Sequence, residues 1–118
     1  MTKQELVATL NVAYGVDGVD GFSEEEKEVL AKELLSYKLA EEDNQEIMQA
    51  YNEMALLDAV NIIAQASEEV RKEAHALIVY TCISDESSDA ERGAYTLMKC
   101  LCGLPAVDYE EAKQILGF

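Results

Sequence analysis

Apolar residues recur at helical spacing along almost the whole chain, and this period restricts the fold more than any other feature. Leu6, Leu10 and Ala13, for example, follow the i, i+4, i+7 spacing that places side chains on one face of a helix. A single proline and six glycines leave little room for the many turns of an all-β fold. We therefore predict an all-α fold, a compact bundle of about six or seven helices. Whether 41–54 and 55–66 form one helix or two stays open. The predicted helices span residues 6 to an end within 15–21, where three glycines interrupt, and then 23–37, 41–54, 55–66, 67–83, 88–102 and 108–116.

Several helix starts are marked by capping boxes, in which Ser or Asp precedes Glu by three residues. The Ser or Asp side chain accepts a hydrogen bond from the Glu backbone N–H, and the Glu side chain reaches back to the cap. Ser67, which is followed by two glutamates, indicates a further start, and Gly103 with Pro105 predicts a helix end. The capping boxes are Ser23–Glu26, Ser88–Glu91 and Asp108–Glu111.

Two of these boxes lie in acidic turns that repeat each other, DGFSEEEK from Asp20 and DESSDAER from Asp85. Each turn follows an apolar helix end and precedes an amphipathic helix, and one constant offset relates the matching positions. A helix–acidic turn–helix unit that is used twice explains this pattern. Two such hairpins around a pseudo-two-fold axis would make a single domain over residues 1–118. The matching residues are Asp20, Ser23, Glu24, Glu26 and Lys27 in the first turn, and Asp85, Ser88, Asp89, Glu91 and Arg92 in the second.

The repeated unit resembles the TerB-like (tellurite resistance protein B-like) domain, which contains two acidic turns of this kind. The resemblance extends from Leu6 to about Leu104. The sequence departs from the family pattern in three ways. It has one residue fewer between Asp20–Gly21 and Ser23, it has Glu86 where the family has Gly, and it has an additional Asp17–Gly18 pair upstream. The resemblance implies an all-α bundle whose acidic surface is linked to stress responses, protein scaffolding and association with divalent metal ions. The residues that carry it are Asp20, Gly21, Ser23 and Glu26, then Asp85, Ser88 and Glu91.

The charge of the chain is strongly negative and unevenly distributed. The formal net charge is −15, from 24 acidic and 9 basic residues, and the stretch 39–70 contains no Lys or Arg. Such a surface repels nucleic-acid backbones and anionic membranes, and it attracts divalent cations or basic proteins. We therefore expect a protein partner with a basic surface and no direct binding of nucleic acid. The acids of this base-free stretch are Glu41, Glu42, Asp43, Glu46, Glu53, Asp58, Glu68 and Glu69.

The apolar runs of the chain are short. The longest, LIVYTCI at 77–83, falls far below the ~20 residues that a membrane-spanning helix needs. The first residues, MTKQELVATL, lack the combined basic start, apolar centre and cleavage site of a signal peptide. We therefore expect no membrane span and a cytoplasmic location.

The two acidic turns are candidate sites for Ca²⁺ or another divalent cation, because such ions take several oxygen ligands. An EF-hand does not fit, since Gly21 at loop position six would put Val16 at position one and Lys27 at position twelve. Any site would be irregular and weak. A second interpretation is that Ser and Glu only cap the helices while the other acids face water. The candidate metal ligands are Asp17, Asp20, Glu24 and Glu26 in the first turn, and Asp85, Asp89 and Glu91 in the second.

The three cysteines and the single histidine match the ligand count of a zinc site but not its spacing. Cys100 and Cys102 diverge by about 200° around a helix, and His75 shares a face only with Cys82. The odd number of cysteines favours reduced thiols. The sequence contains neither a phosphate-binding loop nor a nucleophile elbow. We predict a protein that is not an enzyme and has no certain cofactor.

Two hypotheses of function follow, and they place function at different residues. In the first, the chain is a non-enzymatic TerB-like interaction module that associates with divalent cations at the two acidic turns. In the second, it is an inhibitor that mimics a polyanion, such as an immunity protein against a nuclease, and acts through the base-free stretch. Met48, Tyr51 and Met54 have the spacing of core residues, but their exposure would instead indicate a groove for a partner helix. The sequence leaves the partner, the ion and the oligomeric state open.

Overall fold

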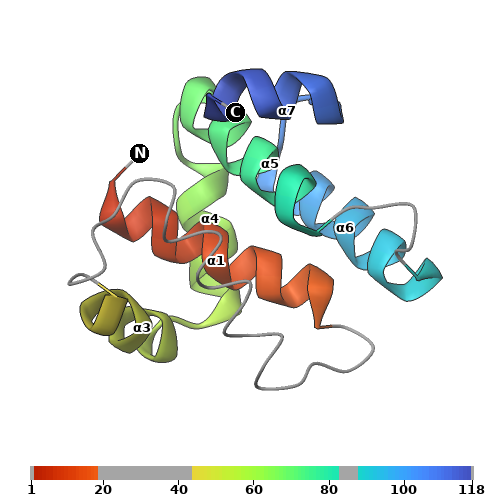
Figure 1. Ribbon diagram of the computed structural model, residues 1–118. Coiled ribbons are helices and arrows are strands. Elements are labelled where there is room, and N and C mark those ends of the chain that lie inside the picture. The colour runs from red at the N-terminus through yellow and green to blue at the C-terminus, as the bar shows by residue number, and fades with distance from the viewer. Residues whose placement is uncertain (1, 19–43, 83–87, 118) are drawn as a thin grey trace.

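The computed structural model describes residues 2–18, 44–82 and 88–117, which form six α-helices and no strand (Figure 1). This confirms the predicted all-α fold. None of these six helices is long and apolar enough to cross a membrane. The helices are α1 (Lys3–Asp17), α3 (Asn44–Glu53), α4 (Leu56–Ala64), α5 (Glu68–Cys82), α6 (Asp89–Cys102) and α7 (Tyr109–Leu116).

Helix α1 is the central element of the bundle and contacts α3, α4, α5 and α6. It begins with a capping box, in which Thr2 Oγ1 accepts from the Glu5 N–H (3.1 Å) and Glu5 Oε1 accepts from the Thr2 N–H (2.7 Å). Residues 6–14 are all buried, whereas the apolar spacing predicts burial of one face only. The polar Thr9 and Asn11 satisfy their side chains by donating to backbone carbonyls one turn earlier.

Helices α3, α4, α5 and α6 surround α1, and several of the helices also pack on one another. Helix α4 contacts α5 and α6, and α7 packs along α5 (Figure 1). Together they bury one continuous apolar core, and each buried Leu or Ile side chain stabilises the fold by about 1.5–3 kcal/mol. The largest fully buried side chains of this core include Leu10 of α1, Ile47 of α3, Ile63 of α4, and Leu77 and Ile78 of α5.

The helix is interrupted between α3 and α4. The predicted segments 41–54 and 55–66 therefore belong to two helices and not to one. Helix α3 ends at Glu53, and Ala55 is extended (φ −72°, ψ 149°) as the N-cap of α4. Ala55 offers no side-chain cap, and its carbonyl accepts from the Ala59 N–H at 3.0 Å. The break lets α3 lie along one side of α1 while α4 runs across it (Figure 1).

The described helix ends confirm that the predicted Ser and Asp side chains cap the helices, whereas the return contact from Glu to the cap N–H stays a prediction at Ser88 and Asp108. Helix α6 ends at Gly103, whose φ of +61° is the left-handed conformation that favours glycine at this position. Ser23 and Glu26, the first predicted box, lie outside the described residues. The capping hydrogen bonds run from the N–H of Val70 to Ser67 Oγ (3.2 Å), of Glu91 to Ser88 Oγ (3.1 Å) and of Glu111 to Asp108 Oδ1 (2.8 Å).

The proposed repeat can be followed only in part. Helices α1 and α5, which precede the two acidic turns, contact each other, and α6, which follows the second turn, packs on α1. Residues 19–43 and 83–87 lie outside the described residues, and they include the whole of the first repeated turn (20–27) and the start of the second (85–92). The duplication and its two-fold axis therefore stay a prediction.

Candidate binding groove

Most of the predicted cation ligands fall outside the part of the chain that the structure describes, namely Asp20, Glu24, Glu26 and Asp85. Asp17 is the last residue of α1, and its side chain also lies outside it.

The two described candidates, Asp89 and Glu91, lie in the first turn of α6, where Asp89 is exposed and Glu91 half-buried. The Ser88 hydroxyl donates to Glu91 Oε1 (3.3 Å) and accepts from the Glu91 N–H, so Glu91 contributes to the helix start. Among the described residues, no three or more His, Cys, Asp or Glu side chains converge as metal ligands would.

His75 is buried on α5, and both of its ring nitrogens are engaged. Nδ1 contacts the Pro105 carbonyl oxygen, and Nδ1 must carry the proton because a carbonyl can only accept. Nε2 then accepts from the Tyr95 hydroxyl. Burial lowers the pKa of His75, the hydrogen bond to Pro105 opposes this shift, and the charge of Lys99 adds to it. His75 is therefore a neutral link between α5, α6 and the segment 103–108.

The two described thiols face different surroundings, as their spacing on the helix predicts. Cys100 is exposed, whereas Cys102 is buried in the core. Burial raises the pKa of Cys102 to about 11, so its thiol stays protonated at neutral pH. The side chain of Cys82 lies outside what the structure describes. Cys102 and His75 thus serve packing and hydrogen bonding between helices.

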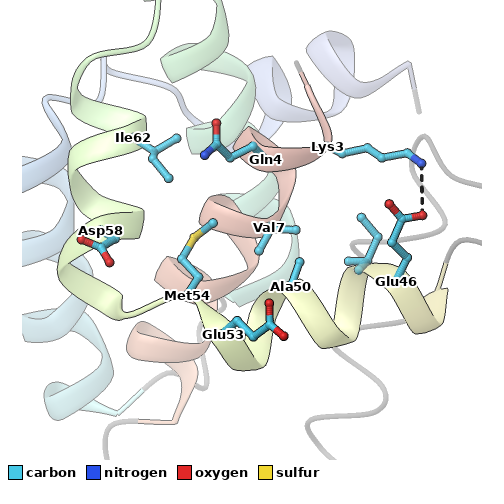
Figure 2. Close-up of a pocket in the computed structure, with 10 residues that line it drawn as sticks. Lys3, Gln4, Val7, Glu46, Ala50, Glu53, Met54, Asp58 and Ile62 are labelled. Atoms are coloured by element: carbon cyan, nitrogen blue, oxygen red, sulfur yellow. Dashed lines mark ion pairs between the residues drawn. The ribbon is translucent and has the colours of Figure 1, made fainter.

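A groove of about 530 Å³ lies between α1, α3 and α4 (Figure 2). Five of the ten lining residues are apolar, and five are polar or charged. The apolar half forms the floor, and the polar half forms the rim. The apolar residues are Val7, Ile47, Ala50, Met54 and Ile62, and the polar ones are Lys3, Gln4, Glu46, Glu53 and Asp58.

The floor combines buried and accessible side chains from all three helices. Val7 and Ile47 form its base and are only 2% and 1% exposed. Ala50, Met54 and Ile62 are half-buried, so they present apolar surface to the groove. Met54 stands at the break between α3 and α4, and its flexible thioether can adapt to different ligand shapes.

The rim is acidic along its length. Figure 2 shows Glu46 and Lys3 at one end of the groove and Asp58 at the other, with Glu53 between them. Lys3 Nζ lies 3.7 Å from Glu46 Oε2, and both side chains are largely exposed. Such an exposed ion pair contributes about 0–1 kcal/mol. Among the ten described residues that line the groove, three carboxylates stand against one ammonium group.

The sequence pattern marks some of these residues, but it does not indicate that they form one site. Glu46, Glu53 and Asp58 appeared only as members of the base-free stretch. Of the residues considered as a possible groove, Met54 lines the groove, whereas Tyr51 packs edge-on against Tyr14 with ring centroids 4.7 Å apart. The side chain of Met48 lies outside what the structure describes.

The lining residues from α1 carried no sequence signal for a groove. Only the packing of α1 against α3 brings Lys3 to the carboxylate of Glu46.

The fold and the groove define a small all-α bundle with an acidic-rimmed apolar groove. No protein-family model matches the sequence, and a comparison with curated proteins finds no match. The chain is similar to the crystal structure of a protein of unknown function from Porphyromonas gingivalis W83, with a TM-score of 0.81 and 25% sequence identity. The similarity covers 100% of this chain and 91% of that chain. The whole bundle is therefore an arrangement that a solved protein shares.

Proposed function

We propose that the chain is a non-enzymatic interaction module that binds a protein partner with a basic surface through α3 and α4. The observation that carries this proposal is the rim of the groove, where Glu46, Glu53 and Asp58 are exposed and Lys3 supplies the single positive charge of the lining. Carboxylates that point into water without a strong partner remain available to cations on another protein. The engaged nitrogens of His75 and the protonated thiol of Cys102 support a role other than catalysis.

The net charge of the molecule supports the same proposal. A formal net charge of −15 creates a negative field that accelerates encounter with a basic partner. The contact itself then depends on where the carboxylates lie. In the polyanion-mimic form of this proposal, the partner is a basic enzyme such as a nuclease, and the rim carboxylates occupy the place of phosphates.

The resemblance to TerB-like domains adds a second element to the proposal, weak association with divalent cations at the acidic turns. Calorimetric titration with Ca²⁺ and then Mg²⁺ tests it on the chelator-treated protein. Saturable heat that Asp20→Asn/Asp85→Asn removes supports a cation site. No heat at millimolar ion removes this element and leaves the basic-partner proposal intact.

The experiment that tests the basic-partner proposal compares two charge-reversal variants as baits in a host lysate. Glu46→Lys/Glu53→Lys changes the groove, and Glu110→Lys/Glu111→Lys changes exposed acids of α7. Each Glu→Lys substitution changes the net charge by +2. Each double variant therefore has a formal net charge of −11 in place of −15. We expect a basic protein to be retained by the wild type and the α7 variant and lost by the groove variant. Equal retention by both variants would contradict a role for the groove.

A further inference from the structure

We propose that the groove receives a basic amphipathic helix of the partner, with two Lys or Arg residues two turns apart and apolar residues between them on the same face. This inference rests on the proposed function and specifies the element that the partner presents. It follows from the spacing of the rim carboxylates, from the apolar floor between them and from the chemistry that other occupants would need.

The spacing of the α3 carboxylates sets the spacing of the partner's charges. Glu46 and Glu53 are seven residues apart, which is two turns of one helix face and about 10.5 Å along the axis. Both line the groove, with Ala50 between them on the same face. A second helix that lies alongside α3 has the same rise per residue. Cations at its positions i and i+7 therefore reach both carboxylates at once.

The apolar floor of the groove determines which side chains the partner helix needs between its two cations. Ala50 is small, so a partner helix can approach α3 closely between the two carboxylates. Met54 and Ile62 then provide accessible apolar surface for side chains at the partner's i+3 and i+4 positions. Helix α3 has ten residues, which correspond to about 15 Å, so the expected contact covers about three turns of the partner.

The existing contacts of the two carboxylates are exchangeable. Lys3 lies 3.7 Å from Glu46 in an exposed ion pair, and Gln49 Nε2 donates to Glu53 Oε1 at 3.3 Å, also at the surface. Both contacts lie at the surface, where water screens them and competes for the same groups, so they hold the carboxylates only weakly. A cation from the partner can therefore replace them while apolar burial in the groove supplies additional affinity.

Other occupants fit the groove less well. A ligand with a single ammonium group cannot reach both carboxylates across about 10.5 Å. A second copy of this chain offers Arg92 and Lys99 on α6 at the required spacing. Tyr95, which lies between them on that face, is however held inside the bundle by its hydrogen bond to His75. The geometry therefore points to a helix of another protein.

The test uses the full chain and synthetic helical peptides of Ala, Leu and Lys that carry a fluorescent label. The matched peptide has Lys at i and i+7 with Leu at i+3 and i+4. A control peptide of the same composition has its Leu residues at i+2 and i+5, on the face opposite the lysines. We expect fluorescence anisotropy to show saturable binding of the matched peptide, with affinity about tenfold above that of the control peptide.

Variants of the protein separate apolar docking from charge attraction. Ala50→Phe fills the groove without changing charge, and we expect it to abolish the preference for the matched peptide. Glu46→Gln/Glu53→Gln should weaken binding of the matched peptide by about tenfold, while Glu110→Gln/Glu111→Gln, which makes the same change in net charge, should weaken it far less. Thermal unfolding of each variant checks that the fold is retained.

The helix proposal is overturned if the two peptides bind equally, if neither binds, or if spermine displaces the matched peptide as effectively as an unlabelled copy does. These outcomes leave the basic-partner proposal standing as long as the lysate experiment shows groove-dependent retention. Loss of that retention, in contrast, would remove the proposed function itself. Because the peptide comparison uses the wild-type protein, it decides the question even if Ala50→Phe fails to fold.

Discussion

At the scale of single residues, His75 makes the stability of the fold depend on pH. Burial holds the pKa of His75 below its ordinary value of about 6.5, with Lys99 acting in the same direction. The unfolded chain therefore binds more protons than the native state as the pH falls below about 6.5. His75 stabilises the fold fully above this pH, and its contribution is lost as the pH falls towards the native pKa. We expect a lower free energy of unfolding at pH 5.5 than at pH 7.5 in urea denaturation.

The variant His75→Gln separates this effect from the titration of the many surface carboxylates. Glutamine carries no titrating group, and it leaves hydrogen-bonding groups of Pro105 and Tyr95 poorly satisfied, which costs about 1–3 kcal/mol at pH 7.5. The variant should therefore be less stable at pH 7.5 but lose less stability than the wild type on going to pH 5.5. An unchanged loss in the variant would show that His75 does not cause the pH dependence.

The partners of His75 could not be predicted from the sequence. Periodicity placed His75 and Cys82 on one helix face, and spacing argued against a zinc site. The observed partners, Tyr95 and Pro105, are 20 and 30 residues away along the chain. Such hydrogen bonds depend on how α5, α6 and the segment after α6 pack, and no local pattern encodes that packing.

At the scale of elements, substitution by Ala should have opposite effects on stability at Gly93, inside α6, and at Gly103, which caps the C-terminal end of α6. A Cβ at Gly93, inside the helix, would meet no atom within 4 Å, so Gly93→Ala should stabilise the protein by about 0.5–1 kcal/mol. Gly103 ends the helix at φ +61°, and a Cβ there would lie 3.2 Å from Arg71 Nη1. Gly103→Ala should destabilise the protein by about 1–2 kcal/mol. Urea denaturation of both variants checks these values, and destabilisation by Gly93→Ala would indicate that another surface packs closely on α6.

The helix ends show which elements the sequence could predict. Ser67, Ser88 and Asp108 cap helices as predicted, because a cap requires only residues three apart. Thr2 and Glu5 form a complete capping box at the start of α1, and their spacing of three residues in the sequence is a sufficient signal for it. The break at Ala55 has no such signal, since neither proline, glycine nor a capping side chain marks it. Packing of α3 and α4 on α1 decides it.

At the scale of the whole molecule, the helical spacing of apolar residues was enough to predict an all-α fold. It did not predict how the helices are placed relative to one another. The complete burial of residues 6–14 depends on four helices that cover α1 from different directions. The groove arises at the same level, because α1, α3 and α4 each contribute part of its lining. Charge composition predicted an acidic surface, but the line from Glu46 through Glu53 to Asp58 required the fold.

This distribution of charge predicts opposite effects of salt on folding and on binding. Repulsion among 24 acids that only 9 bases oppose destabilises the native state, and NaCl screens that repulsion. Raising NaCl from ~20 mM to ~200 mM should therefore increase the free energy of unfolding by on the order of 1 kcal/mol. The same salt screens attraction between the groove and a basic helix, so affinity for the matched peptide should fall. Urea denaturation and anisotropy at matched salt concentrations measure the two responses. If affinity were independent of salt while stability rose, the rim carboxylates would not contribute to recognition, and binding would depend on the apolar floor formed by Ala50, Met54 and Ile62.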